Sequence, residues 1–183
     1  CLKEDEYHLT VLGVIRRPDG KYLITRRVLT KAWAPGWWEV SGGAAQAGES
    51  SEEAVRREVL EETGLDVNGC AGGYMFTYHR ENPGEGDNYF VDVYRFEKDF
   101  KEEDLHLQTE ETAGYKIATA DEIKALADEG IFLHYDSIKR VFEEWKNELA
   151  YSASSSHFSY KVSSSASISA RSFASSWHFT EFV

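Results

Sequence analysis

The chain has 183 residues, of which 42% are hydrophobic, and this length predicts one domain with a sizeable core. Its formal net charge of −12 disfavours non-specific binding to nucleic acid. The sequence contains no run of about 18 apolar residues and no visible signal peptide, so it predicts no association with a membrane. Cys1 and Cys70 are too few for a disulfide framework, which fits a reducing, cytoplasmic setting.

The first part of the chain predicts a β-hairpin. Because the chain begins with Cys1 rather than Met, we expect a trimmed product with a polar lead-in. Residues 7–15 are rich in Leu, Val, Thr and Ile, which is typical of a buried strand. Residues 17–20 (Arg-Pro-Asp-Gly) have the composition of a turn, and residues 22–28 predict the returning strand.

A tryptophan-rich segment leads to a cluster of glycines. Residues 31–38 predict a loop that contains Trp33, Trp37 and Trp38. Residues 39–41 predict a short extended piece, and we expect a flexible loop from Gly42 onwards, since glycine permits tight turns and close approach of the backbone to phosphate.

A helix follows this predicted loop. Ser50 and Glu53 have the spacing of a capping box, so we expect the helix to begin near Ser51. Gly64 has the position of a left-handed helix end. The helix is therefore predicted over residues 51–63.

The glutamates of this helix lie on an unexpected face. At about 100° per residue, Glu58, Glu61 and Glu62 share a face with the apolar residues. Those apolar residues are Ala54, Val55 and Val59. An ordinary amphipathic helix would place carboxylates on the opposite face. A bound divalent cation would relieve the repulsion and the loss of hydration, and carboxylate oxygens suit Mg²⁺ or Mn²⁺. The alternative is a solvated helix with salt bridges, because Arg57 is four residues from both Glu53 and Glu61.

The second half of the domain predicts further strands and two helices. We expect strands at residues 66–68, 72–78, 89–96 and 115–118, with polar or acidic loops at 79–88 and 98–112. Residues 120–129 predict a short helix. Residues 135–149 carry apolar side chains at helical spacing, namely Ile138, Val141, Phe142, Trp145 and Leu149. Strands mixed with helices in this order predict an α/β/α sandwich.

The composition changes after residue 150. Residues 151–183 hold 13 serines in 33 positions and show no strand or helix period. We therefore predict a domain at residues 1–150 and a serine-rich tail outside its fold.

The segment from the glycines to the end of the helix resembles the signature of the Nudix hydrolases. Nine defined positions agree: Gly43, Glu49, Arg57, Glu58, Val59, Glu61, Glu62, Gly64 and Leu65. The flanking Trp-Trp-Glu-Val-Ser-Gly-Gly is also similar to the family, and the resemblance spans roughly residues 7–149. It implies a Nudix-like α/β/α sandwich with a mixed β-sheet.

The resemblance also implies a reaction and a metal site. It implies metal-dependent hydrolysis of the diphosphate linkage in a nucleoside diphosphate derivative or a related small-molecule diphosphate. Its cofactor would be Mg²⁺, with Mn²⁺ as an alternative, held by Glu58, Glu62, Glu61 and the carbonyl of Gly42. Glu49 and Arg57 would orient these ligands.

The general base and the substrate contacts are less closely defined. Glu110 and Glu111 precede the last predicted strand, and we favour Glu111 as the base, with a solvated loop carboxylate as the alternative for either. Trp33, Gly43 and Arg27 are the predicted substrate contacts. The histidines His8, His106 and His134 do not have the spacing of metal ligands.

Two alternatives to a hydrolase follow from the same resemblance. A ligand sensor without catalysis would be expected to have a degraded signature and a DNA-binding segment, and neither is present in this sequence. A prenyl diphosphate isomerase would need a cysteine before the helix, where this chain has Ser41-Gly42-Gly43. The sequence does not identify the substrate. It also leaves the oligomeric state open, and a homodimer is one of the options.

Overall fold

The structure is a computed structural model that describes residues 7–81 and 88–143. Its centre is one mixed β-sheet of seven strands. The strands are β1 (His8–Arg16), β2 (Tyr22–Arg27), β3 (Trp38–Glu39), β4 (Ser41–Ala44), β5 (Ala71–Arg80), β6 (Tyr89–Glu97) and β7 (Thr112–Ala118). The main path of the sheet runs β3-β2-β1-β6-β5, with β4 paired to β1 and β7 paired to β2. The pair β1 and β6 is parallel, and the other pairs are antiparallel.

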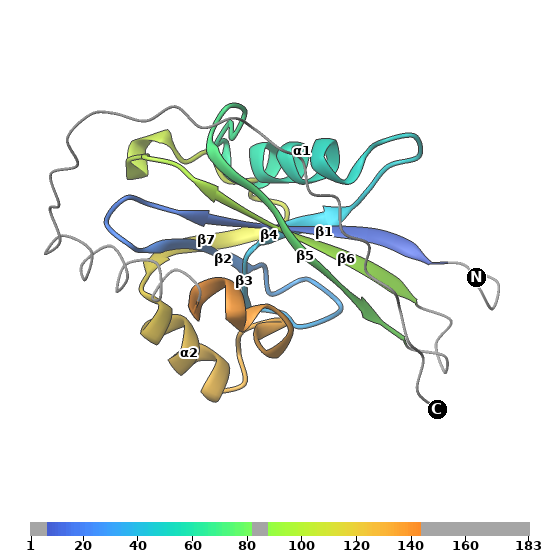
Figure 1. Cartoon of the computed structure of the whole chain (residues 1–183). Helices are drawn as coiled ribbons and strands as arrows, with labels where there is room; N and C mark the ends of the chain where they lie inside the picture. The colour runs from blue at the N-terminus through green and yellow to red at the C-terminus, as the bar shows by residue number, and fades with distance from the viewer. Residues whose placement is uncertain (1–6, 82–87, 144–183) are drawn as a thin grey trace, which may run out of the picture.

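Helices cover both faces of this sheet. Helix α1 (Ser51–Thr63) lies on one face, and α2 (Ala120–Asp128) lies on the other together with the helical residues 135–143 (Figure 1). A short 3₁₀ turn, η1 (Glu102–Asp104), precedes β7. The predicted α/β/α sandwich with a mixed sheet is therefore confirmed.

The alternation of β1 divides the core into two layers. Val11 and Ile15 pack with Val55 and Val59 of α1, whereas Leu12 and Val14 belong to the cluster on the opposite face. Between them, a side chain at Gly13 would come within 2.6 Å of Val59 Cγ2, so this glycine allows α1 to approach the sheet closely. Complete burial of each valine or isoleucine contributes about 1.5–3 kcal/mol, so these contacts hold α1 firmly on β1.

The glycines before α1 differ from the prediction. Gly42 and Gly43 lie in strand β4 and pair with Leu12 and Val11 of β1, whereas we expected a flexible loop. A side chain at Gly42 would collide with the carbonyl oxygen of Val11. These glycines therefore serve the close approach of two strands and of α1, and the turn comes later, at Gly48 with a φ of +85°.

Residues 66–68 also differ from the prediction, because they form a turn and not a strand. The Asp66 carboxylate accepts a hydrogen bond from the backbone N–H of Asn68 at 2.8 Å, which favours a turn over a ladder. The predicted strand that follows is longer than expected, since β5 begins at Ala71 and ends at Arg80.

Some predictions lie wholly or partly outside the described residues. The last helix is described at residues 135–143, where Ile138, Val141 and Phe142 are buried as its spacing predicts, and residues 144–149 are not described. The serine-rich tail and residues 82–87 also lie outside. Within the described ranges, no helix has both the length and the apolar character needed to cross a membrane.

Candidate active site

Helix α1 begins and ends as its sequence predicts. Ser50 caps the helix, and the capping box is complete: Glu53 N–H donates to Ser50 Oγ, and Ser50 N–H donates to the Glu53 carboxylate. Gly64 ends the helix in the left-handed conformation with a φ of +78°. The helix register, and hence the direction of each glutamate, is therefore determined locally.

Two of the three predicted ligand glutamates face the protein interior. Glu62 is 8% exposed and lies among the buried residues of α1, and Glu58 is partly buried. Glu61 differs from them, because 52% of its side chain is exposed. The predicted sharing of a face with Val55 and Val59 thus applies most clearly to Glu58 and Glu62.

Strand β4 lies directly against this pair of carboxylates. The backbone N–H of Gly42 donates to Glu62 Oε2 at 3.3 Å. A side chain at Gly43 would stand 2.5 Å from the carboxyl carbon of Glu58. Glycine at position 43 therefore leaves the room that the Glu58 carboxylate occupies, and β4 and α1 together form one wall of the site.

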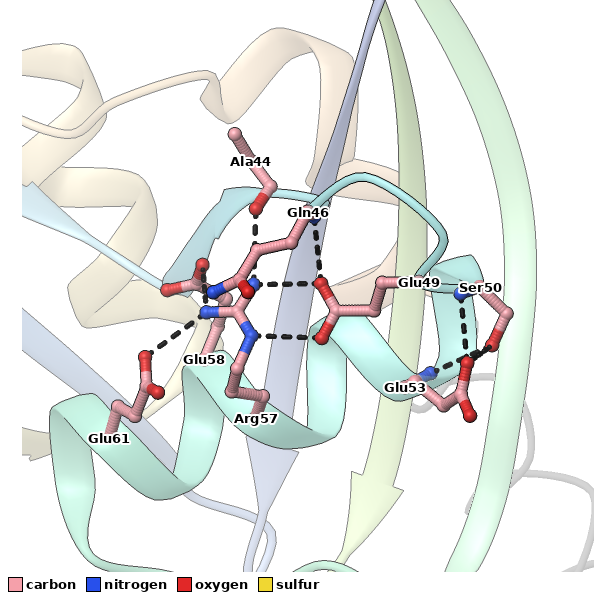
Figure 2. Close-up of polar contacts among 8 residues, drawn as sticks. All are labelled: Ala44, Gln46, Glu49, Ser50, Glu53, Arg57, Glu58 and Glu61. Carbon is pink, nitrogen blue, oxygen red and sulfur yellow. Dashed lines mark hydrogen bonds and ion pairs between the residues drawn. The ribbon is translucent and has the colours of Figure 1, made fainter.

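Arg57 links most of the remaining acidic groups (Figure 2). Its guanidinium donates to both carboxylate oxygens of Glu49, at 2.8 and 3.0 Å, and to the carbonyl oxygen of Ala44 at 3.1 Å. It also donates to Glu58 at 2.8 Å and to Glu61 at 3.1 Å. Such a bidentate pair with Glu49 fixes the orientation of Arg57, which in turn orients Glu58 and Glu61.

The loop before α1 is tied to the same network. Glu49 Oε2 also accepts a hydrogen bond from the backbone N–H of Gln46 at 2.8 Å. The hydrogen bonds from Arg57, followed by that from Gln46, lower the pKa of Glu49 below its usual value. Glu49 is thus kept ionised and connects the loop to the helix.

The buried glutamates have the opposite shift. Burial, and secondly the nearby Glu39 carboxylate, raise the pKa of Glu62 to about 8. Burial also raises the pKa of Glu58, against the lowering effect of Arg57. Both carboxyl groups therefore need either a proton or a positive charge beside them to remain in this position.

This donor set fits a hard divalent cation. Buried carboxylate oxygens close to a strand backbone are ligands that Mg²⁺ and Mn²⁺ accept. In the ranges 7–81 and 88–143, no three acidic, histidine or cysteine side chains are gathered as a complete metal site, and Arg57 holds Glu58 and Glu61 instead. The ligand set of Glu58, Glu61, Glu62 and the Gly42 carbonyl stays a prediction.

The structure distinguishes the two candidates for the general base. Glu111 pairs with Lys31 at 3.1 Å, and its charge adds to burial and to Glu61 in raising the pKa of Glu58. Both glutamates are exposed, and the Glu110 carboxylate accepts a hydrogen bond from Thr109 Oγ1 at 3.5 Å. Glu111 is therefore the candidate that lies near the carboxylates of α1.

A small cavity opens beside β4. Its volume is about 160 Å³, and it is lined by Thr10, Leu12, Arg27, Trp33, Glu39, Val40, Gly42, Gly43, Leu133 and His134. The predicted substrate contacts Arg27, Trp33 and Gly43 are thus brought together around one space. A larger hollow of about 510 Å³ lies between α2 and residues 135–143, but neither Gly42 nor Gly43, the β4 residues next to Glu62 and Glu58, lines it.

The cavity contains two titratable residues, Glu39 and His134, that were not predicted from the sequence. Glu39 accepts hydrogen bonds from Arg27 at 3.0 and 3.2 Å, and burial raises its pKa despite Arg27. The signal in the sequence that could have identified Glu39 is a carboxylate between the apolar residues Trp38 and Val40. His134 had no such signal: backbone hydrogen bonds from Trp38 to Ile131 and from Leu133 to Trp38 bring it to the site.

Comparisons with known proteins agree with this architecture. The NUDIX domain family matches residues 6–141 of the chain. An uncharacterized Nudix hydrolase of Listeria innocua is 36% identical over 143 residues, which are 78% of this chain and 81% of that protein. The nucleoside triphosphatase NudI of Salmonella heidelberg is 42% identical over 55 residues, 30% of this chain and 39% of that protein.

The solved structures give the same fold. The MutT protein of Methanosarcina mazei Go1 superimposes with a TM-score of 0.62 at 23% identity, covering 80% of this chain and 98% of that one. The family match extends over most of the described domain and includes β4, α1 and the carboxylates on them. The chain therefore belongs to the Nudix hydrolase family.

Proposed function

We propose that this protein is a divalent-cation-dependent hydrolase that cleaves the diphosphate linkage of a nucleoside diphosphate derivative or a related small molecule. The observation that carries this proposal is the pair of buried Glu62 and partly buried Glu58, which lie on α1 against Gly42 and Gly43 of β4, two residues that line the cavity. Two carboxylates in such a position repel each other unless positive charge is placed between them. A diphosphate brings further negative charge to the same place.

Mg²⁺, or Mn²⁺ in its place, would be held by Glu58 and Glu62, with Glu61 and the Gly42 carbonyl as further ligands. The cation supplies positive charge that neutralises phosphate oxygens and acidifies water at the site. Arg57 and Glu49 keep the acidic side chains in register with β4 through the hydrogen bonds described above. Their removal would leave the ligands in place on the helix but without fixed orientation.

Glu111 is the residue we propose as general base. It lies near Glu58, and its ion pair with Lys31 keeps the carboxylate at the end of the segment that precedes β7. A carboxylate there can accept the proton of the attacking water. Glu110, which points to Thr109, is the less favoured candidate.

The charge distribution supports an anionic small molecule as substrate. The chain as a whole carries a net charge of −12, whereas Arg27 lines the cavity, Lys31 pairs with Glu111, and Arg57 lies on α1 among its glutamates. The same net charge argues against nucleic acid as a partner. A relative that is similar over 55 residues is named as a nucleoside triphosphatase, which supports a nucleotide substrate. We propose a cytoplasmic enzyme.

The test is a substrate panel with purified protein. Dinucleotides, nucleotide sugars, nucleoside triphosphates and prenyl diphosphates are incubated with Mg²⁺ or Mn²⁺, and the products are separated. We expect cleavage within a diphosphate of at least one nucleotide class, and complete loss of cleavage with excess chelator. Tight binding of a nucleotide without cleavage under either ion would contradict the proposal and indicate a sensor.

A further inference from the structure

The cavity beside β4 has the size of a single heterocycle. Its volume is about 160 Å³. Drug-sized ligands need about 300–1,000 Å³. The cavity next to Gly42 and Gly43 is therefore smaller than a drug-sized site, and we expect it to take one ring system of a larger substrate.

The two sides of this cavity share an unusual backbone feature. In the part of the chain that the structure describes, Ala34 and His134 are the non-glycine residues with positive φ, at +46° and +58°. Ala34 follows Trp33, and His134 itself lines the cavity. This conformation is uncommon for residues other than glycine, and residues held in it cluster at active sites and ligand clamps.

Trp33 forms an aromatic wall that is held in place but remains open. Its carbonyl oxygen accepts hydrogen bonds from Arg27 Nε and Nη2, both at 3.3 Å, and Arg27 is anchored by Glu39. The Arg27 guanidinium lies 5.5 Å from the centre of the indole ring. Trp33 is nevertheless 52% exposed, so a large apolar surface is available for stacking.

His134 provides a polar group on the opposite segment. Its ring lies 5.9 Å from that of Trp33, at 37°. Within residues 7–81 and 88–143, neither ring nitrogen has a hydrogen-bond partner. Burial, then the charges of Arg80 and Arg27, lower the pKa of His134, so the ring is neutral at pH 7 and offers one donor and one acceptor.

We propose that His134 is a specificity-determining residue, which reads the polar edge of one nucleobase while Trp33 stacks on its face. This inference rests on the proposed function and narrows it. The substrate would be a nucleoside di- or triphosphate with a single base in the cavity and its phosphates at the glutamates of α1. A site built to hydrogen-bond a base rejects analogues that leave its polar groups unpaired.

The experiment compares substrates that do and do not carry a base. The values of kcat and KM are measured with Mg²⁺ for the four ribonucleoside triphosphates and for inorganic tripolyphosphate. We expect His134→Phe to lower kcat/KM for the preferred nucleotide about tenfold, mainly through KM, and to narrow the differences among the four bases. Hydrolysis of tripolyphosphate should be unchanged, because it has no base to place in the cavity.

Matched variants separate recognition from folding. His134→Asn tolerates the positive φ and keeps a donor and an acceptor, so it should retain most of the base preference. Trp33→Ala should lower kcat/KM for all four nucleotides about tenfold, and Trp33→Phe should largely restore it. His8→Phe, at an exposed histidine on β1, is the control and should change nothing. If His134→Phe does not unfold cooperatively, it is not properly folded. The inference is then tested by comparing Trp33→Ala with Trp33→Phe in the same kinetic measurements.

Two results would overturn the inference: equal kcat/KM for tripolyphosphate and nucleotides in the wild type, or unchanged base preference in His134→Phe. A wild type that cleaves nothing would instead contradict the proposed hydrolase. In that case, calorimetry with the four ribonucleoside monophosphates tests whether Trp33 and His134 bind a nucleobase. Binding that depends on Trp33 and His134 supports it, and absence of binding overturns it.

Discussion

The two walls of the candidate active site are built in different ways. The acidic wall comes from one continuous stretch, β4 and α1, in which residues 41–63 supply Gly42, Gly43, Glu58 and Glu62. The wall of the cavity comes from segments that are far apart in the chain, including β1, the Trp33 loop and His134. Both walls meet at the glycines of β4.

This difference separates the proposed metal binding by the acidic wall from the proposed substrate selection by the cavity. Helix geometry and a capping box fix the directions of the carboxylates, so the proposed metal side of the site is defined largely by one local stretch. The cavity depends on loop lengths and on how the last helix returns to the sheet. Changes there can alter the substrate without disturbing the acidic wall, which is why the fold alone does not identify the substrate.

The largest expected effect concerns the buried glutamate of the acidic wall. Glu62→Gln keeps the shape of the side chain but removes its negative charge, so we expect kcat/KM to fall about 10³-fold and Mn²⁺ affinity to fall with it. Glu61→Gln, at a half-exposed position, should cost only about tenfold. Steady-state kinetics and Mn²⁺ titration measure both. Glu52→Gln, an exposed glutamate paired with Arg56, is the control. Equal losses at positions 61 and 62 would show that burial does not rank the ligands.

The next effect concerns Glu111, the proposed general base. Glu111→Gln should lower kcat about 10²-fold with Mn²⁺ affinity little changed, because it removes a proton acceptor and not a ligand. Glu110→Gln should stay near the wild-type rate. Single-turnover rates with saturating Mg²⁺ give the comparison. The reverse order of the two variants would assign the base to Glu110, and two active variants would place it elsewhere.

A smaller effect should appear in the stability of the metal-free protein. Burial raises the pKa of Glu62 in the folded state to about 8, above its ordinary value of 4.5. The stabilising contribution of the protonated carboxyl is therefore complete below about pH 4.5 and is lost as the pH rises through 8. Glu62→Gln mimics the protonated form, so its free energy of unfolding should exceed that of the wild type by about 1–3 kcal/mol at pH 8 and by almost nothing at pH 4. Urea unfolding in the presence of a chelator at both pH values measures these free energies. If the two proteins differed by the same free energy at pH 4 and pH 8, the raised pKa of Glu62 would be contradicted.

The sequence was sufficient for the acidic wall. The hairpin β1–β2, helix α1 with its caps, and the sandwich all follow from local periodicity and turn chemistry, and each is confirmed. The helix angles also place Glu58 and Glu62 on the buried face. Local information was misleading for Gly42 and Gly43, since their strand pairing depends on β1, about 30 residues earlier in the chain.

The assembly of the cavity wall could not be predicted from local sequence patterns. Trp33 and Arg27 were predicted as substrate contacts, but nothing in the sequence indicated that Glu39 would anchor Arg27. His134 reaches the cavity because backbone hydrogen bonds join residues 131–133 to Trp38, and a histidine in a loop carries no periodic signal of that contact. Residues brought together by long-range pairing are visible only in the folded chain.

The most direct test of the account is the position of a bound cation. Crystals of the wild-type protein soaked in Mn²⁺ should show anomalous density at the Glu58 and Glu62 carboxylates, beside the carbonyl of Gly42, and Arg57 should release Glu58 while keeping Glu49. The density should disappear in Glu62→Gln. Strong anomalous density only at histidines or surface carboxylates away from α1, with Glu58 and Glu62 unliganded, would contradict the central claim that this buried pair is the metal site.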